Sequence, residues 1–355
     1  MNCGEILVDD LRSFSEGVDR LVSVEVTGRG VAEQLQTAAR ALAGAPLAMG
    51  AASLLKGALA ERGCAVFIAT GFPIHPYYLP EQDGIVGAAS LARALVLAYG
   101  AHPILVVNPA DEEAASRALV AASLYSRSVE AALDLPATAA VVPFPVDSEH
   151  ASKVAADLCD RAHPAAMVAI ERPGANENGD YHSGGGLRLT DHCGKVEALL
   201  PLLKAAKIPT IAIGDGGNEL GCSGIRDAVI EKVPGAARCS CPCQGSLVPV
   251  AEIDWLVIAS VSNWGSYGIE ACLAALERMP ELLHTPETDR RIHEACAAAM
   301  ANNGAPNLLE PGSDAIPLHV HGAILEILDW MVRAAALDAG RYYRRPRYPW
   351  LDQVR

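Results

Sequence analysis

The sequence reads Ile211-Ala-Ile-Gly-Asp215-Gly-Gly-Asn-Glu219-Leu-Gly221 where an apolar run stops at a glycine-rich turn that carries two carboxylates. A second apolar run, residues 165–170, ends in the same way at Glu171. In open, mostly parallel sheets the functional groups gather just beyond the carboxyl ends of the strands. The two stretches therefore predict an α/β protein whose site lies where two neighbouring strands end.

Short apolar runs alternate with amphipathic segments over residues 64–260, which is typical of βα units. The strands are expected at 64–69, 104–107, 139–142, 165–170, 210–213 and 255–260, and the helices between them at 85–99, 111–124, 148–161, 194–206 and 222–233. This alternation predicts a doubly wound, mostly parallel, Rossmann-like sheet with helices on both faces. Further helices are expected at 265–278, 286–300 and 322–337.

The chain is expected to contain three parts. Residues 1–62 have apolar positions at helical spacing and many alanines, so they are predicted to form a helical N-terminal segment packed on the core. Residues 63–337 form the α/β catalytic domain in this interpretation. Residues 338–355, which are basic and aromatic, are expected to be a C-terminal tail.

Composition limits the classes of partner. The 355 residues are 51% hydrophobic, and 42 acidic against 28 basic residues give a net charge of -14, which repels nucleic acid. The sequence has neither a basic leader nor about eighteen consecutive apolar residues, so no membrane partner is expected. We therefore expect a cytoplasmic protein that acts on a small-molecule substrate. Homo-oligomerisation is left open.

The glycine-rich turn is not a dinucleotide fingerprint, because the third glycine of G-x-G-x-x-G would fall on Glu219. Its acidic residues repel one another and need a cation, a shared proton or a basic ligand. Carboxylate oxygens suit Mg²⁺ or Mn²⁺ better than zinc. The predicted metal ligands are Glu171, Asp180, Asp215 and Glu219. Two alternatives stay open: a helix cap by Asp215 or Asn218, and a solvated acidic rim.

Two other loops are predicted to reach the same edge of the sheet. Thr70-Gly-Phe-Pro follows the first strand, and Asp83-Gly84 precedes a helix, where Asp83 can cap that helix or hold a substrate amine. Val261-Ser-Asn-Trp-Gly265 follows the last strand and brings neutral hydrogen-bonding groups. For this second loop the alternative is a cap on the following helix.

Cys239-Ser-Cys241-Pro-Cys243 has one-residue spacing, whereas structural zinc sites use two to four intervening residues, and no fourth ligand is evident nearby. On an extended strand the three thiols would share one face, so a buried or redox-sensitive patch is expected. His182 and His192 are interpreted as ordinary polar residues.

Four of these segments together resemble the D-glutamate cyclase C-terminal-domain family, over roughly residues 30–335. They are Thr70-Gly-Phe-Pro with Asp83-Gly84, Ile170-Glu-Arg-Pro-Gly174 with residues 179–181, residues 213–221, and residues 261–265. The resemblance implies an α/β domain whose animal relatives convert D-glutamate to 5-oxo-D-proline with loss of water. It also implies that those relatives carry a second, N-terminal domain similar to hydro-lyases, which we do not expect in this chain.

The resemblance suggests roles for single residues. A divalent metal, Mg²⁺ or Mn²⁺, would polarise the γ-carboxylate, while Asp83 or Glu177 takes the ammonium proton and Asp215 also acts in catalysis. The predicted substrate-binding residues are Thr70, Gly71, Gly214, Gly216, Asn218, Ser262 and Asn263.

Two other functions are compatible with the same residues. A metal held by carboxylates at strand ends also suits a phosphohydrolase, although only Arg172 and Arg188 are basic residues close to the glycine loops. The third hypothesis is a non-catalytic metabolite-binding partner of a hydro-lyase-like protein.

Overall fold

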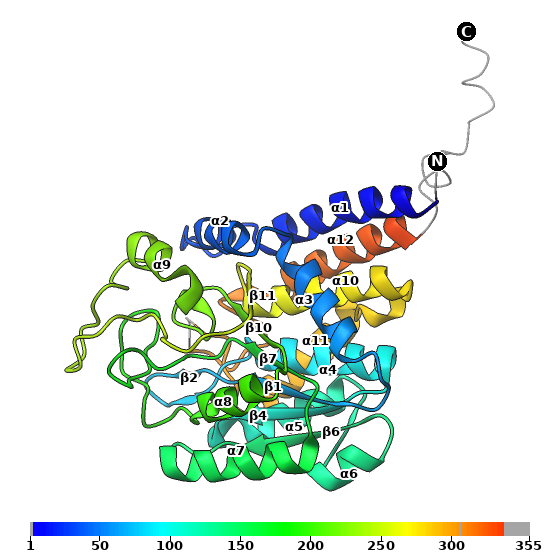
Figure 1. Ribbon diagram of the computed structural model, residues 1–355. Coiled ribbons are helices and arrows are strands. Elements are labelled where there is room, and N and C mark those ends of the chain that lie inside the picture. The colour runs from blue at the N-terminus through cyan, green and yellow to red at the C-terminus, as the bar shows by residue number, and fades with distance from the viewer. Residues whose placement is uncertain (1–2, 305–306, 337–355) are drawn as a thin grey trace, which may run out of the picture.

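One parallel sheet of seven strands forms the centre of the protein, as the α/β alternation predicts (Figure 1). The structure, a computed structural model, describes residues 3–304 and 307–336. The strand order is β5-β6-β4-β1-β7-β8-β9. The strands are β1 (Ala65–Thr70), β4 (His102–Val107), β5 (Tyr125–Arg127), β6 (Thr138–Pro143), β7 (Ala166–Ile170), β8 (Thr210–Gly214) and β9 (Trp255–Ile258). Every residue of β1, β7 and β8 is buried, because helices cover both faces of a parallel sheet.

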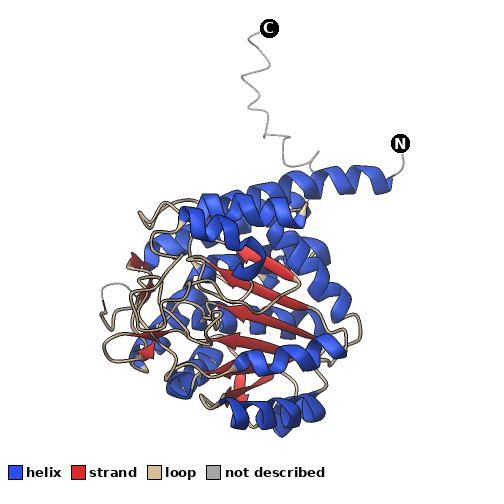
Figure 2. Cartoon of the chain, turned by 60° about the vertical axis from the view of Figure 1, so that its left-hand side comes forward, coloured by secondary structure: helices blue, strands red, loops and turns tan. Residues whose placement is uncertain are grey.

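Helices pack on both faces of this sheet (Figure 2). On one side lie α4 (Ile85–Tyr99), α5 (Glu112–Ala121) and α10 (Ser262–Glu277), and on the other α7 (Ser148–Ala162) and α8 (Leu200–Ala205). The fold is thus the doubly wound α/β architecture. Short helices α6 (Val129–Asp134) and α9 (Arg226–Lys232) follow β5 and β8, and α11 (Pro286–Ala298) and α12 (Leu318–Ala336) end the described chain.

The helical N-terminal segment consists of three helices, α1 (Cys3–Val22), α2 (Ala32–Ala43) and α3 (Leu47–Ala58). Helices α1 and α3 both pack on α10, and α2 packs beside β9. Helix α10 is buried from Ser262 to Ala275, since α1, α3, α4 and α12 surround it. The helical segment predicted for residues 1–62 is interrupted between α1 and α2 by a loop over residues 24–30, which contains Gly28 and Gly30 at positive φ.

The strand order places a topological switch point between β1 and β7. From β1 the chain adds β4, β5 and β6 on one side and then returns to add β7, β8 and β9 on the other. Thr70 at the end of β1 is in register with Ile170 at the end of β7, and Ile170 with Ile213 of β8. Crevices at such points receive ligands because the loops beyond the strands diverge there. The glycine-rich turn and the loop after β7 both leave the sheet at this edge.

Several local features differ from the sequence-based expectation. The edge strand β5 and helix α6 were not predicted, because each is too short to show a hydrophobic period. Two small hairpins, β2 (Pro73–Ile74) with β3 (Leu79–Pro80) and β10 (Gly312–Ser313) with β11 (Ile316–Pro317), were also missed. The tail predicted for residues 338–355 lies outside the described residues.

Within residues 3–304 and 307–336, no single helix combines the length and apolar composition needed to cross a membrane. Helices α2 and α3 meet these criteria only as a pair, across a bend of 50°.

Candidate functional site

Carboxylates from two loops meet beyond the ends of β7 and β8. Oxygens of Glu171, Asp215 and Glu219 all lie within 4.8 Å of one another, and all three side chains are buried. Glu171 directly follows β7, and Asp215 directly follows β8. The sequence-based prediction that these three residues converge is therefore confirmed, although the convergence does not by itself assign them a ligand.

Asp215 belongs to a second group of carboxylates as well. Its oxygen lies within 4.8 Å of oxygens of Asp83, before α4, and Asp314, in the β10–β11 hairpin. Glu81 is also buried, and its negative charge acts on Asp314 and Glu171. We call these six residues the acidic cluster: Glu81, Asp83, Glu171, Asp215, Glu219 and Asp314. Glu81 and Asp314 were not predicted as members, because tertiary packing brings the loop after β3 and the β10–β11 hairpin to this edge.

The glycines of the turn after β8 make room for Glu219. The backbone N–H groups of Gly216 and Gly217 donate to its two carboxylate oxygens at 2.9 and 2.7 Å. A Cβ atom at Gly214 or Gly216 would fall 2.9 Å from a Glu219 oxygen. Both glycines were predicted to bind substrate, and in the structure they shape the loop around this carboxylate.

Asp83 and Asn263 cap two helices whose N-termini face each other. Asp83 accepts the backbone N–H groups of Ser262 and Asn263 at the start of α10, at 3.0 and 2.8 Å. The Asn263 side-chain oxygen accepts the backbone N–H groups of Gly84 and Gly87 at the start of α4, at 2.9 and 2.7 Å.

The side chains of Ser262 and Asn263, at the start of α10, also donate hydrogen bonds to neighbouring protein groups. The Asn263 amide donates to Ser313, and the Ser262 hydroxyl donates to Glu171 at 2.6 Å. Asn263 therefore acts as a cap rather than as the predicted substrate contact, but it caps α4 and not the following helix that the sequence suggested. Asp83 caps α10, whereas the sequence suggested a cap on α4.

Arg29 is the cation that pairs with the acidic cluster. Its guanidinium donates to Asp215 at 2.7 and 3.3 Å, to Asp314 at 3.2 Å and to the carbonyl oxygen of Ser260 at 2.8 Å. The loop that carries Arg29 is held by Glu25, whose side chain accepts the N–H groups of Thr27, Gly28 and Gly30. This loop was predicted to be part of a helical segment, so Arg29 was not expected at the site. The two glycines of Thr27-Gly-Arg-Gly30 could have indicated a loop here, because glycine is unfavourable within a helix.

The acidic cluster carries more negative charge than Arg29 balances. Burial raises the pKa of Asp83 and of Glu219 to about 7, and repulsion from Asp215 adds to both shifts. Burial and repulsion from Asp215 also raise the pKa values of Glu81, Glu171 and Asp314. At neutral pH the cluster therefore holds protons or takes up a further cation.

Glu177 and Asp180 lie outside the acidic cluster, so their predicted roles as base and metal ligand need correction. Asp180 accepts hydrogen bonds from Arg188 and Thr190, both at 2.6 Å. Glu177 is half-exposed and accepts the N–H and hydroxyl groups of Ser246. The loop after β7 is long enough to carry these two side chains away from the acidic cluster. The sequence pattern does not show the path of this loop.

Three other predicted residues surround the cluster. The Thr70 hydroxyl is buried beside Glu171 and Gly84 and has no hydrogen-bond partner among the described residues. The Gly71 carbonyl oxygen accepts from Asn108 and from Arg172, each at 3.0 Å. Asn218 donates to the carbonyl oxygen of His182 at 3.0 Å. Of these, Thr70 has a polar atom that is free to meet a ligand.

The two arginines close to the glycine loops are both engaged by protein groups. Arg172 is buried and binds the carbonyl oxygens of Thr70, Gly71 and Gly194, which fixes the end of β1. Arg188 pairs with Asp180 and Asp191.

The order of these segments agrees with a known family. A family model described as "D-glutamate cyclase-like, C-terminal" matches residues 18–329, which include every member of the acidic cluster and Arg29. The chain belongs to this family. Among curated proteins, human mitochondrial D-glutamate cyclase is 31% identical over 235 residues. The match takes in 63% of this chain and 35% of the human protein, so the chain spans about a third of that relative's length.

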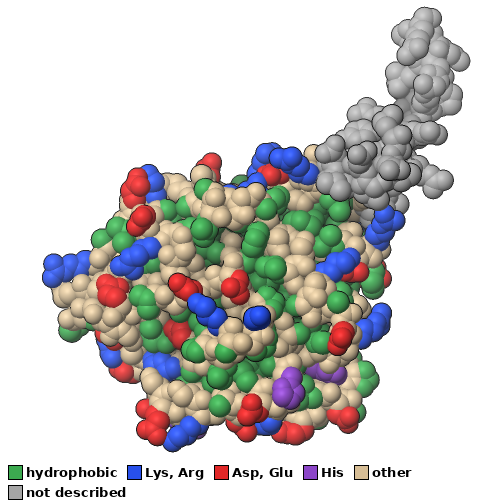
Figure 3. Space-filling model, viewed as in Figure 1, with side chains coloured by type: hydrophobic (Ala, Val, Ile, Leu, Met, Phe, Trp, Pro, Cys, Tyr) green, Lys and Arg blue, Asp and Glu red, His purple; other side chains and the backbone are tan. Residues whose placement is uncertain are grey.

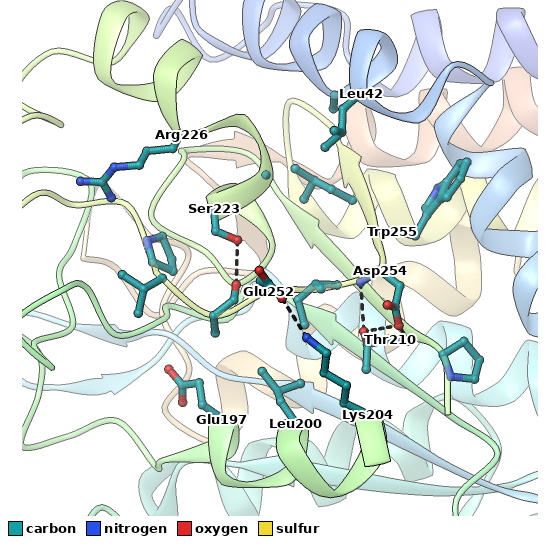
Figure 4. A pocket seen from close by; sticks show the side chains of 18 of the residues that line it. Leu42, Glu197, Leu200, Lys204, Thr210, Ser223, Arg226, Glu252, Asp254 and Trp255 are labelled. Carbon is teal, nitrogen blue, oxygen red and sulfur yellow. Dashed lines mark hydrogen bonds and ion pairs between the residues drawn. The ribbon is translucent and has the colours of Figure 1, made fainter. Parts of the chain in front are cut away.

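A large groove in this D-glutamate cyclase-like chain lies away from the acidic cluster (Figure 4). Its volume is about 1400 Å³, and α2, α8, β9 and the loop before β9 line it. Some of its polar groups pair with each other, as in Lys204–Glu252 and Thr210–Asp254. None of the six clustered carboxylates lines this groove.

On the face shown in Figure 3, acidic and basic side chains are interspersed rather than gathered into one patch of a single sign.

Proposed function

We propose that this chain is a D-glutamate cyclase-like lyase, which closes D-glutamate or a related amino acid to 5-oxo-D-proline with loss of water, assisted by a divalent cation. The convergence of Glu171, Asp215 and Glu219 carries this proposal, together with membership of the family. In the reaction the substrate ammonium and γ-carboxylate become an amide and one water molecule, so charge and atoms balance.

The carboxylates of the cluster fit a hard cation. Glu171, Asp215 and Glu219 offer only oxygen donors, which Mg²⁺ and Mn²⁺ prefer, and their surroundings are short of positive charge. These three residues would hold the ion. A bound divalent cation supplies Lewis-acid polarisation of the γ-carboxylate.

Asp83 is our candidate for the base that accepts the ammonium proton. Its pKa of about 7 lies where a carboxylate can both take and return a proton at neutral pH, and it neighbours Asp215 and Asp314. Its backbone N–H contacts hold the carboxylate in one orientation. Arg29 and the Thr70 hydroxyl are donors beside the cluster that suit a substrate carboxylate.

The test is production of 5-oxoproline from D-glutamate, with L-glutamate as the matched substrate, in Mg²⁺, Mn²⁺ or chelator. Chiral chromatography separates the products. We expect turnover of D-glutamate that chelator abolishes and that Asp215→Asn lowers at least about 100-fold. Asp19→Asn is the control, since Asp19 is a buried carboxylate that caps α3 outside the cluster.

Two results contradict the proposal. Absence of product from the wild type under every cation condition rejects the activity. Unchanged turnover by Asp215→Asn rejects the acidic cluster as its site.

A further inference from the structure

Four soft metal-binding side chains meet in the loop region above the sheet. The Nε2 atom of His182 lies 3.3 Å from the Cys241 sulfur and 3.4 Å from the Cys243 sulfur. The Cys239 sulfur lies 3.3 Å from that of Cys241 and 3.4 Å from that of Cys243. All four donor atoms lie within 4.8 Å of one another. We propose that Cys239, Cys241, Cys243 and His182 form a structural zinc site.

The distances suit tetrahedral coordination. Zinc–sulfur bonds of about 2.3 Å and zinc–nitrogen bonds of about 2.0–2.1 Å place neighbouring sulfurs roughly 3.8 Å apart and sulfur and nitrogen roughly 3.5 Å apart. The nitrogen–sulfur contacts of 3.3 and 3.4 Å are close to this geometry. The sulfur–sulfur contacts of 3.3 and 3.4 Å are shorter than it, so the thiols would move apart on binding the ion. Three thiolates and one imidazole complete a four-coordinate shell, which is the composition of structural rather than catalytic zinc sites.

Hydrogen-bond donors surround the sulfurs, as they do around metal-bound thiolates. Backbone N–H groups of Cys243 and Gly245 point at the sulfurs of Cys241 and Cys243, both at 3.4 Å. The Asn176 amide donates to the Cys243 sulfur at 3.6 Å. Such donors offset thiolate charge and orient the ligands. His182, Cys239 and Cys241 are each less than 10% exposed, so bulk water is largely excluded from the shell.

The spacing of the cysteines does not argue against this site once the fold is known. The extended strand that the sequence suggested was wrong, and the fourth donor is not near the cysteines in the sequence but comes from His182, many residues earlier. Residues 241–243 form a turn that folds three thiols inward, and His182 arrives from the loop after β7. Zinc would thus link two loops far apart in the sequence.

This link reaches the glycine-rich turn. The carbonyl oxygen of His182 accepts the Asn218 side chain at 3.0 Å, and Asn218 precedes Glu219 of the acidic cluster. The zinc site therefore braces one wall of the cluster without taking part in its chemistry. It does not depend on the proposed function.

The full chain, purified without chelator, should contain about one zinc per molecule by mass spectrometry of metals. Replacement of zinc by Co²⁺ should give the intense thiolate-to-cobalt charge-transfer absorption that carboxylate ligands do not give. We expect Cys241→Ser and His182→Gln to lose most of the zinc, whereas Cys159→Ser, at a partly buried thiol on α7, and Asp215→Asn retain it.

Folded wild-type protein with neither zinc nor the charge-transfer bands overturns the proposal, as does a disulfide between two of the three cysteines. Zinc that Asp215→Asn removes and Cys241→Ser retains would assign the metal to the acidic cluster instead. If the Cys241 and His182 variants fail to fold, the cobalt spectrum of the wild type decides alone.

Discussion

Asp83 and Asn263 cap each other's helices: Asp83 caps α10, which carries Asn263, and Asn263 caps α4, which begins just after Asp83. Asp83, just before α4, accepts two N–H groups of α10, and Asn263, in the first turn of α10, accepts two N–H groups of α4. Helix N-termini leave N–H groups without intrahelical partners, and here two buried helices exchange acceptors. The exchange fixes the geometry of the loop that carries Asp83 into the acidic cluster.

Removing the Asn263 cap should destabilise the protein more than removing the Asp83 cap. We expect Asn263→Ala to lower the free energy of unfolding by about 2 kcal/mol, because buried N–H groups lose their acceptor. Asp83→Ala should cost less, since it also relieves repulsion with Asp215. Urea unfolding of both variants and of the double variant measures this. Ser128→Ala, which removes an exposed cap on α6, is the control and should cost about 0.5 kcal/mol. Equal losses for Asp83→Ala and Asn263→Ala would show that repulsion in the cluster is unimportant.

Arg29 should stabilise the metal-free protein. Arg29→Gln leaves the buried Asp215 without its ion pair, so in chelator we expect a loss of about 1–2 kcal/mol, reduced by the partial exposure of Arg29. Added Mn²⁺ should raise the unfolding temperature of this variant more than that of wild type, because the cluster has one positive charge fewer. Arg226→Gln is the matched control, since Arg226 is equally exposed (38% in both cases) but contacts Glu177 only at 3.8 Å. Identical Mn²⁺ responses in wild type and Arg29→Gln would contradict this account.

Gly84 should tolerate no side chain. Its φ is 81°, and an added Cβ would lie 2.5 Å from the Thr70 hydroxyl and 2.9 Å from the carbonyl oxygen of Ile170. We expect Gly84→Ala to cost about 3 kcal/mol or more, because backbone strain and overlap with β7 add. Gly100→Ala at the other end of α4 has positive φ without any neighbour within 4 Å, so strain alone should cost about 1 kcal/mol. Thermal unfolding of the two variants compares them, and similar values would show that the loop at Gly84 relaxes.

His284 should make stability depend on alkaline pH. Burial by itself lowers the pKa of His284, but Glu270 at 2.7 Å and Asp289 at 3.4 Å outweigh burial and raise it to about 9. Between pH 6.5 and 9 the folded protein holds a proton that the unfolded chain has released, so the free energy of unfolding falls as pH rises through this window. We expect a loss of about 1–3 kcal/mol.

Urea titrations of wild type and His284→Gln at pH 6.5 and 9.5 test this assignment. The variant removes the titrating group, while other groups that ionise at alkaline pH remain in both proteins. The decrease in stability should be clearly smaller in the variant. An equal decrease in both would assign the pH dependence to other residues.

Part of the site could be predicted from the sequence. The residues that were wrongly placed or missed lie far along a loop or on remote segments. Glu171, Asp215 and Glu219 directly follow or lie close behind buried strands, so the position of the strand ends fixed where they meet. Glu177 and Asp180 lie farther along the same loop, and its path depends on contacts with Ser246 and Arg188. Arg29, Asp314 and His182, which we propose as a zinc ligand, join their sites from remote segments, and no local pattern marks such contacts.

The sequence by itself determined the alternation of strands and helices and therefore the sheet edge at which the acidic loops emerge, because hydrophobic periodicity and glycine-rich turns are local properties. Only the tertiary structure decided which charges meet there, which carboxylate caps which helix, and that three cysteines face a histidine. These outcomes depend on long-range packing of α10, the Arg29 loop, the β10–β11 hairpin and the loops after β7 and α9, which brings together side chains that are far apart along the chain.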